Sequence, residues 1–208
     1  LRSFYTFLVL EKIAENNPTE DIDYPKIDSK VPFVLSTNEI DKIILQASLT
    51  KFGTRNQTMI EVMYSCGLRV SEVIEMKISN IFFDESLIKV LGKGKKERFV
   101  PLSGIAKKLL YNYIEFERKE SKFDKQSVDI VFLNNRGGKL SRIMLYNIIN
   151  DAALAAEITS KISPHTLRHS FATHLIENGA DIISIQKMMG HENIVTTEKY
   201  LNVNKKHL

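Results

Sequence analysis

Two arginines in separate blocks of the sequence could bind a phosphate group. Arg69 lies in the block 67–72 (GLRVSE), and Arg168 lies in the block 165–169 (HTLRH). A guanidinium group can bind two phosphate oxygens at once and keeps its charge at any working pH. A lysine ammonium group acts only as a point charge and does not match two oxygens in this way. Breaking a phosphodiester without a metal also needs a nucleophile and a proton donor for the leaving oxygen.

Other residues could supply the nucleophile and the proton transfers. His165 lies three residues before Arg168, so one helical turn would bring both side chains to the same face. Tyr200 lies nine residues after His191 (200 minus 191). A phenol with a pKa of about 10 attacks only where cations favour the phenolate or a neighbouring base takes its proton. Lys93 lies in the cation-rich run 92–98 (GKGKKER).

These blocks, in this order, resemble the signature of the tyrosine site-specific recombinase family, and most of all its Xer-like and phage-integrase-like bacterial members. The resemblance covers about residues 35–203. It implies six catalytic positions: Arg69, Lys93, His165, Arg168, His191 and Tyr200. It also implies that Glu72 orients the catalytic residues and that Lys95, Lys96 and Arg98 contact DNA phosphates, with Lys95 as the alternative to Lys93 for the proton donor.

The resemblance further implies a reaction and its partners. Tyr200 would form a 3′-phosphotyrosyl link that conserves the energy of the phosphodiester bond, so rejoining would need neither ATP nor another cofactor. The substrate would be double-stranded DNA. Family members extend a helix beyond the tyrosine into a neighbouring protomer and act as tetramers on paired sites, whereas this sequence stops eight residues after Tyr200.

The remaining reactive residue types favour structural roles. His169 and His174 share a predicted helix with His165, but Arg168 would repel a divalent metal and no HExxH motif is present, so we expect packing histidines and no metal site. Cys66, the single cysteine, is expected in the core. The other tyrosines assigned to structure are Tyr64, Tyr111, Tyr113 and Tyr146. Neither of the common glycine-rich phosphate-binding loops occurs.

Capping residues and apolar periods predict the elements that would position these side chains. Ser36 with Glu39 forms a capping box, and Ser103 and Ser163 also stand at the start of helical patterns. Helices are expected over about 4–12, 37–47, 54–66, 70–76, 104–114, 141–156, 164–178, 181–189 and 196–201, and strands over 87–91, 98–102 and 130–133. The predicted fold is mostly α with a small antiparallel β-sheet (α+β).

The sequence also predicts how the chain is divided. Residues 17–33 contain three prolines, many acids and no helical apolar period, which is typical of a linker. We therefore expect the catalytic domain at 34–208. Because the chain starts at Leu1 and enters helix-like sequence directly, residues 1–16 are expected to be the last helix of an upstream DNA-binding domain.

Composition limits the class of protein without selecting the function. The formal charge is +4, a modest bias toward polyanionic partners that many other enzymes share. A single cysteine and the lack of a secretory or membrane-spanning pattern favour the cytoplasm. Two alternatives to recombination stay open: a type IB topoisomerase that relaxes supercoils, and a DNA-binding relative that has lost catalysis.

Overall fold

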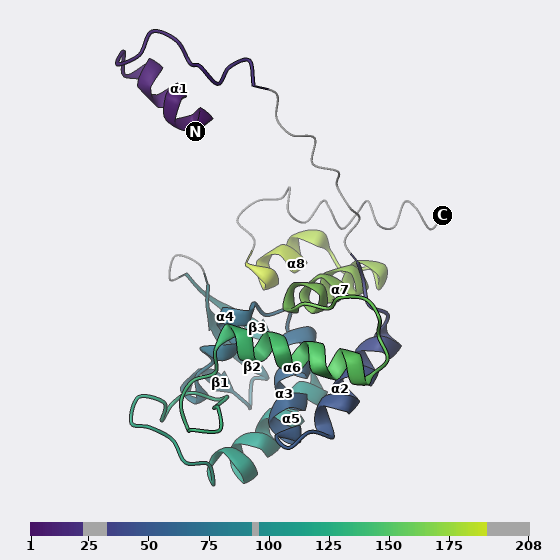
Figure 1. Cartoon of the computed structure of the whole chain (residues 1–208). Helices are drawn as coiled ribbons and strands as arrows, with labels where there is room; N and C mark the ends of the chain where they lie inside the picture. The colour runs from purple at the N-terminus through teal and green to yellow at the C-terminus, as the bar shows by residue number, and fades with distance from the viewer. Residues whose placement is uncertain (23–32, 93–95, 191–208) are drawn as a thin grey trace. The chain divides into compact units, whose positions relative to one another are not determined.

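The computed structural model describes residues 1–22, 33–92 and 96–190. The chain divides into two compact units, Leu1–Val31 and Pro32–Leu208. The first unit contains helix α1 (Arg2–Leu10), which buries none of its residues (Figure 1). The predicted first helix is therefore present. Its origin in an upstream domain, and the division into 1–16, 17–33 and 34–208, stay predictions.

The second unit is built mainly of helices. They are α2 (Thr37–Ser48), α3 (Gly53–Ser65), α4 (Val70–Ile74), α5 (Gly104–Asn112), α6 (Arg142–Ala155), α7 (Pro164–Glu177) and α8 (Ile182–Met189), with a 3-10 turn η1 (Ile78–Asn80) and a π-helical turn η3 (Tyr113–Arg118). Strands β1 (Ile81–Phe82), β2 (Leu87–Leu91) and β3 (Glu97–Pro101) form one antiparallel sheet. The predicted fold class is confirmed. No helix in the described ranges is both long and apolar enough to cross a bilayer.

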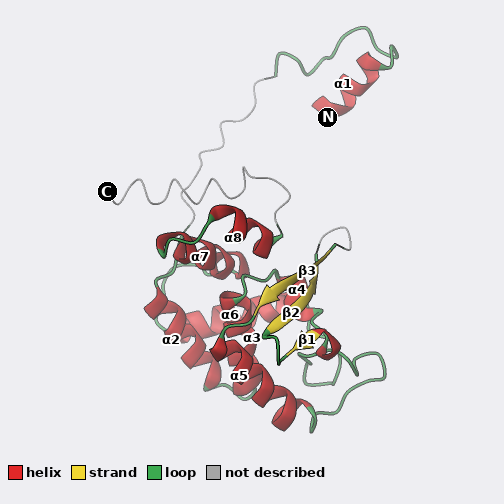
Figure 2. Cartoon of the chain, turned by 180° about the vertical axis from the view of Figure 1, so that it is seen from behind, coloured by secondary structure: helices red, strands yellow, loops and turns green. Residues whose placement is uncertain are grey.

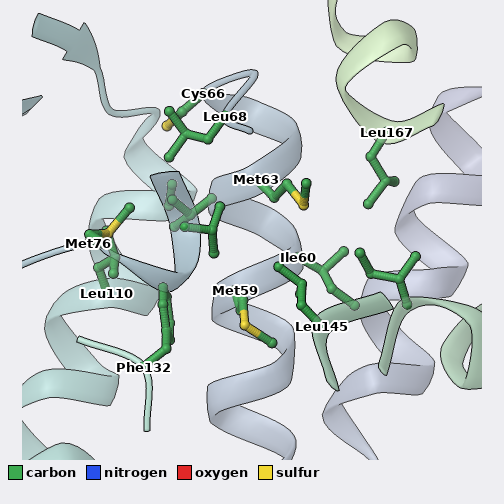
Figure 3. Packing of buried hydrophobic residues seen from close by; sticks show 14 of the residues in the cluster. Met59, Ile60, Met63, Cys66, Leu68, Met76, Leu110, Phe132, Leu145 and Leu167 are labelled. Atoms are coloured by element: carbon green, nitrogen blue, oxygen red, sulfur yellow. The ribbon is translucent and has the colours of Figure 1, made fainter. Parts of the chain in front are cut away.

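Helix α3 is the centre of the core. It contacts α2, α4, α5 and α7, and most of its residues are buried. Figure 3 shows three of its side chains, Met59, Ile60 and Met63, between Leu110 and Phe132 on one side and Leu145 and Leu167 on the other. In the turn that follows α3, Gly67 adopts a φ of +58°. A Cβ there would lie 2.5 Å from the Phe171 ring, so only glycine fits.

Several helices begin at the residues that the sequence predicts. The Ser36 side chain accepts a hydrogen bond from the Glu39 N–H, and the Glu39 carboxylate accepts one from the Ser36 N–H, which completes the capping box. Ser163 forms a capping box with Thr166 at the start of α7, and the Ser103 side chain caps α5 by accepting a hydrogen bond from the Ala106 N–H. These caps fix where α7, which carries His165 and Arg168, begins.

The sheet contains the predicted hairpin but differs from the prediction in two other places. Strand β3 pairs with β2 in the antiparallel register of a hairpin over 87–101, which places Arg98 opposite Val90. The two-residue strand β1 was not predicted, because it is too short to show an alternating pattern. The predicted strand 130–133 is wrong: among the described residues, Ile130 and Leu133 form isolated bridges, to Lys77 and Lys139, and one paired residue at each end does not make a strand.

Candidate active site

Glu72 forms the centre of the candidate site. Its side chain is 2% exposed and lies in the first turn of α4. One carboxylate oxygen accepts the backbone N–H of Arg69 at 2.8 Å, and the other accepts Nη1 of Arg69 at 2.9 Å. The three-residue spacing therefore places Glu72 where its carboxylate caps the N-terminus of α4 and also holds the Arg69 side chain in place.

Arg98 approaches the same carboxylate from β3. Its Nη1 and Nη2 donate to the two oxygens of Glu72 at 2.7 and 2.9 Å, which makes a bidentate ion pair. Burial opposes the charged form of Glu72, but the hydrogen bonds and charges of Arg98 and Arg69 outweigh it and hold the pKa of Glu72 below its ordinary value. Glu72 is therefore ionised at neutral pH.

Arg168 lies on the opposite side of Glu72, on α7. The residue is 5% exposed, and its Nη1 lies 3.9 Å from a Glu72 oxygen. Nη1 also donates to the carbonyl of Gly67, which lies in the turn after α3. Three guanidinium groups from α4, β3 and α7 thus surround one carboxylate, and we call Glu72, Arg69, Arg98 and Arg168 the arginine cluster.

The end of α8 rests on this cluster. Three successive carbonyls accept hydrogen bonds from three different arginines: Met188 from Arg98 Nε at 2.7 Å, Met189 from Arg168 Nη2 at 2.5 Å, and Gly190 from Arg69 Nη2 at 2.8 Å. Figure 2 shows α8 beside β3, and the two elements are in contact. The last carbonyls of a helix have no partner within it, and cations are favourable there. The arginines therefore fix the point at which α8 ends.

A pocket of about 480 Å³ opens beside the cluster. It contains Arg69, which is 29% exposed, and His165, which is exposed at the first turn of α7. The other lining residues are Val70, Ser71, Arg142, Ile143, Tyr146, Ser163 and Pro164. The structure thus brings His165, Arg69 and, through Glu72, Arg168 to one side of the domain.

Four of the predicted site residues, Lys93, Lys95, His191 and Tyr200, lie outside the described residues. The described residues next to Lys93 and His191, which are Gly92 and Gly190, nevertheless lie at the cluster. Ideal Cβ positions on Gly92 and Gly190 fall 3.4 and 3.2 Å from Nη1 of Arg98. Their roles, and that of exposed Lys96, stay predictions.

Several of the residues assigned to structure lie in packed positions. His169 is buried, and burial lowers the pKa of its imidazole to about 4. His174 Nδ1 shares a hydrogen bond of 2.8 Å with the Tyr64 hydroxyl. Tyr113 stacks on Phe132. Among the described residues there is no group of three or more His, Cys, Asp or Glu that could hold a metal.

Cys66 and two further tyrosines complete this set. The thiol of Cys66 is buried in the core, and burial raises its pKa to about 12, so it stays protonated. The Tyr111 ring packs edge-on against Phe83, while Tyr146 lines the pocket. Of these residues, Tyr146 is therefore the only one that lines the pocket beside the arginine cluster.

Sequence reasoning missed the position of Arg98. It predicted a phosphate contact on an open hairpin, whereas the side chain is 13% exposed and directs Nε, Nη1 and Nη2 toward Met188 and Glu72. A signal was present in the sequence. Arg98 lies two residues before buried Val100, so both side chains lie on the same face of β3. Contact between Arg98 and phosphate stays a prediction.

Comparison with known proteins gives one consistent result. The model of the phage integrase family matches residues 34–207. Tyrosine recombinase XerD of Oceanobacillus iheyensis is 43% identical over 209 residues, an alignment that spans 100% of this chain and 70% of the relative. Tyrosine recombinase XerC of Anoxybacillus flavithermus is 42% identical over 210 residues, with the same coverage.

Solved structures agree with the sequence relatives. The crystal structure of XerA recombinase superposes with a TM-score of 0.75 at 30% identity, covering 95% of this chain and 75% of that one. XerH site-specific recombinase bound to palindromic difH substrate, a post-cleavage complex, gives a TM-score of 0.79 at 26% identity, covering 92% and 56%.

Proposed function

The chain belongs to the phage integrase family of tyrosine recombinases, and from this premise we propose that it cleaves and rejoins double-stranded DNA through a covalent link between Tyr200 and a 3′-phosphate. Enzymes of this family carry out site-specific recombination by strand cleavage and rejoining. The observation that supports the proposal most strongly is the arginine cluster, whose three guanidinium groups outnumber its one carboxylate at the edge of an open pocket.

The proposed roles follow from this charge distribution. Arg69 and Arg168 bind the non-bridging oxygens of the scissile phosphate and stabilise the negative charge that grows in the transition state. Glu72 orients both guanidinium groups and does not face the phosphate itself, because a carboxylate there would repel it. Arg69 is the more accessible of the two arginines, and His165 lies beside it at the same pocket.

The bond changes balance without a cofactor. The Tyr200 oxygen attacks phosphorus while the bond from phosphorus to the 5′-oxygen breaks. Lys93 donates a proton to the departing 5′-oxygen, and His165 accepts the phenol proton while His191 hydrogen-bonds the phosphate. Rejoining reverses these steps when a 5′-hydroxyl attacks the phosphotyrosyl link.

Further parts of the proposal concern partners and place. Lys95 and Lys96 contact neighbouring phosphates, so binding weakens steeply with added salt as counterions return to the DNA. The protein assembles as a tetramer on two paired sites and acts in the cytoplasm. Solved relatives support DNA as the partner, since XerH is described in complex with its difH substrate.

A trapping experiment tests the proposal. The 208-residue chain is incubated with a library of nicked duplexes of randomised sequence, in which the cleaved strand loses its short 5′-hydroxyl fragment and cannot be rejoined. We expect a covalent protein–DNA adduct, which Tyr200→Phe abolishes and Tyr111→Phe preserves. If Tyr146→Phe loses the adduct and Tyr200→Phe keeps it, the nucleophile is Tyr146 and the assignment of Tyr200 is wrong. Sequencing the attached DNA end identifies the preferred site.

A second assay separates recombination from the alternatives. A plasmid that carries two copies of the trapped site should yield resolved or inverted products on a gel. Relaxation of supercoils without exchange between the two sites would indicate topoisomerase activity instead. Binding without any adduct would indicate a DNA-binding relative that has lost catalysis.

A further inference from the structure

Arg98 contacts two parts of the candidate site, Glu72 and the end of α8, although the sequence analysis did not assign it to catalysis. Two of its nitrogens bind Glu72, and the third binds the Met188 carbonyl at the end of α8. Each of these groups is buried or half-buried, so the contacts are shielded from water and salt. A side chain engaged in this way links β3, α4 and α8.

Two glycine backbones also lie against the guanidinium group of Arg98. A Cβ on Gly190 would lie 3.2 to 3.3 Å from three of its atoms, and a Cβ on Gly92 would lie 3.4 Å from Nη1. The N–H of Gly92 donates to the Lys96 carbonyl at 2.8 Å, which closes the base of the β2–β3 hairpin. Lys93 follows Gly92 in the sequence, and His191 follows Gly190.

From this juxtaposition we propose that Arg98 is a positioning residue for strand cleavage: it holds Glu72, the base of the β2–β3 hairpin and the end of α8 in one arrangement. The proposal rests on the proposed function, since cleavage is the activity that the arrangement serves. Arg98 acts through other groups and does not contact the reacting atoms. This positioning role replaces the phosphate contact that the sequence predicted for Arg98.

A positioning role and a phosphate contact predict different measurements. If Arg98 bound a DNA phosphate, Arg98→Met would weaken DNA binding and lower the slope of log K against log salt by about one. If Arg98 positions the site, that slope stays unchanged. At saturating DNA, adduct formation then becomes about 100-fold slower, the scale on which a misplacement of one ångström reduces a rate.

The acid side of the rate profile gives a second readout. The charged groups that face Glu72 among the described residues are Arg69 of the α4 N-terminus, Arg98 of β3 and Arg168 of α7. Removing Arg98 takes away two donors, so the pKa of Glu72 rises and the rate of adduct formation falls at a higher pH than in the unchanged protein. Loss of stability alone would not move this profile.

Arg118→Met is the matched control. Arg118 is also buried, and it donates to the carbonyls of Ser127, Val128 and Ile130 away from the arginine cluster. We expect Arg118→Met to destabilise the protein without changing the rate at saturating DNA or its pH profile. Arg98→Lys keeps the charge but loses the bidentate pair, so its rate should lie between those of Arg98→Met and the unchanged protein.

Hydrogen exchange without DNA separates failure of this inference from failure of the proposed function. Arg98→Met should speed exchange at the end of α8 and at the hairpin base, with α3 and α7 unchanged. Unchanged exchange at both places, or a normal rate with a lower salt slope, overturns the positioning role. If the unchanged protein itself forms no adduct, the proposed function fails, and exchange still decides whether Arg98 links the three elements.

Discussion

The protein buries arginines in two regions, and the two differ in what neutralises them. Arg55 and Arg118 donate to backbone carbonyls around Leu133 and Ile130, and rings of Phe52 and Phe123 cover their guanidinium groups. Burial lowers the pKa of both, and neither forms an ion pair with a carboxylate among the described residues. These arginines fasten the 127–134 segment to the core.

The arginine cluster is built for a different purpose. There Arg69, Arg98 and Arg168 share one carboxylate, and the cluster borders an open pocket instead of a closed core. One anion among three cations leaves positive charge that a phosphodiester can neutralise. In this protein, buried arginines therefore indicate a phosphate site where they outnumber the neighbouring carboxylates and border an open pocket.

The largest expected effect is on the rate of cleavage. Arg69→Lys and Arg168→Lys should each slow adduct formation by about 100- to 1000-fold, because an ammonium group cannot reproduce two donors aimed at the phosphate oxygens. Arg118→Lys should leave the rate unchanged. Single-turnover kinetics at saturating DNA measure this, and equal rates for all three variants would remove the distinction between the two regions.

The next effect concerns stability. Glu72→Gln should lower the free energy of unfolding by about 3–5 kcal/mol, because it leaves buried guanidinium groups without their anion. Glu75→Gln, one turn along, breaks an ion pair with Lys139 in which the Glu75 side chain is 55% exposed, and should cost less than about 1 kcal/mol. Urea denaturation at pH 7 compares the two, and similar losses would contradict the buried role of Glu72.

The sign of the Glu72 contribution sets its pH dependence. Its pKa is lower in the folded protein than in the unfolded chain, so the stability it provides is complete above its ordinary pKa and is lost as the pH falls through the folded value. Stability of the Glu72→Gln variant should therefore fall less steeply below about pH 4.5 than that of the unchanged protein.

His169 provides a separate pH effect of about 3 kcal/mol at most. Its pKa is lowered from 6.5 to about 4 by burial, so the unfolded chain binds a proton that the folded protein rejects. Stability should therefore be complete above pH 6.5 and decline toward pH 4. Thermal melts between pH 5 and 6.5 should lose this slope in His169→Met and keep it in His165→Gln, whose imidazole is exposed.

The smallest effect comes from two glycines with positive φ. Gly179→Ala meets no atom within 4 Å and should cost about 1 kcal/mol for the left-handed backbone alone. Gly190→Ala adds a methyl group 3.2 Å from Arg98, so it should slow adduct formation in addition to its cost in stability, whereas Gly179→Ala should leave the rate unchanged. Equal rates for the two variants would indicate that the end of α8 tolerates displacement from Arg98.

Local signals explain how much of this structure the sequence predicts. Ser36, Ser103 and Ser163 form caps with residues three positions away, and the pairing of Arg69 with Glu72 depends on one helical turn. These features need no knowledge of the tertiary fold. The mostly helical fold with its hairpin follows from the same kind of signal.

Long-range contacts explain what the sequence does not predict. Arg98 reaches Glu72 across 26 residues, a contact that depends on the β2–β3 register and on the position of α4 against the sheet. The arginine contacts to Met188, Met189 and Gly190 depend on where α8 docks. A run of cations on a hairpin does not indicate which member points inward.

The most direct test of the account asks whether Arg69 neutralises the charge of the scissile phosphate. The trapped duplex is resynthesised with a neutral methylphosphonate at the cleaved position, and adduct formation is timed for the unchanged protein and for Arg69→Ala. If Arg69 binds a charged phosphate oxygen, the defect of Arg69→Ala is large on the phosphodiester and small on the methylphosphonate. A defect of the same size on both substrates would contradict the central claim.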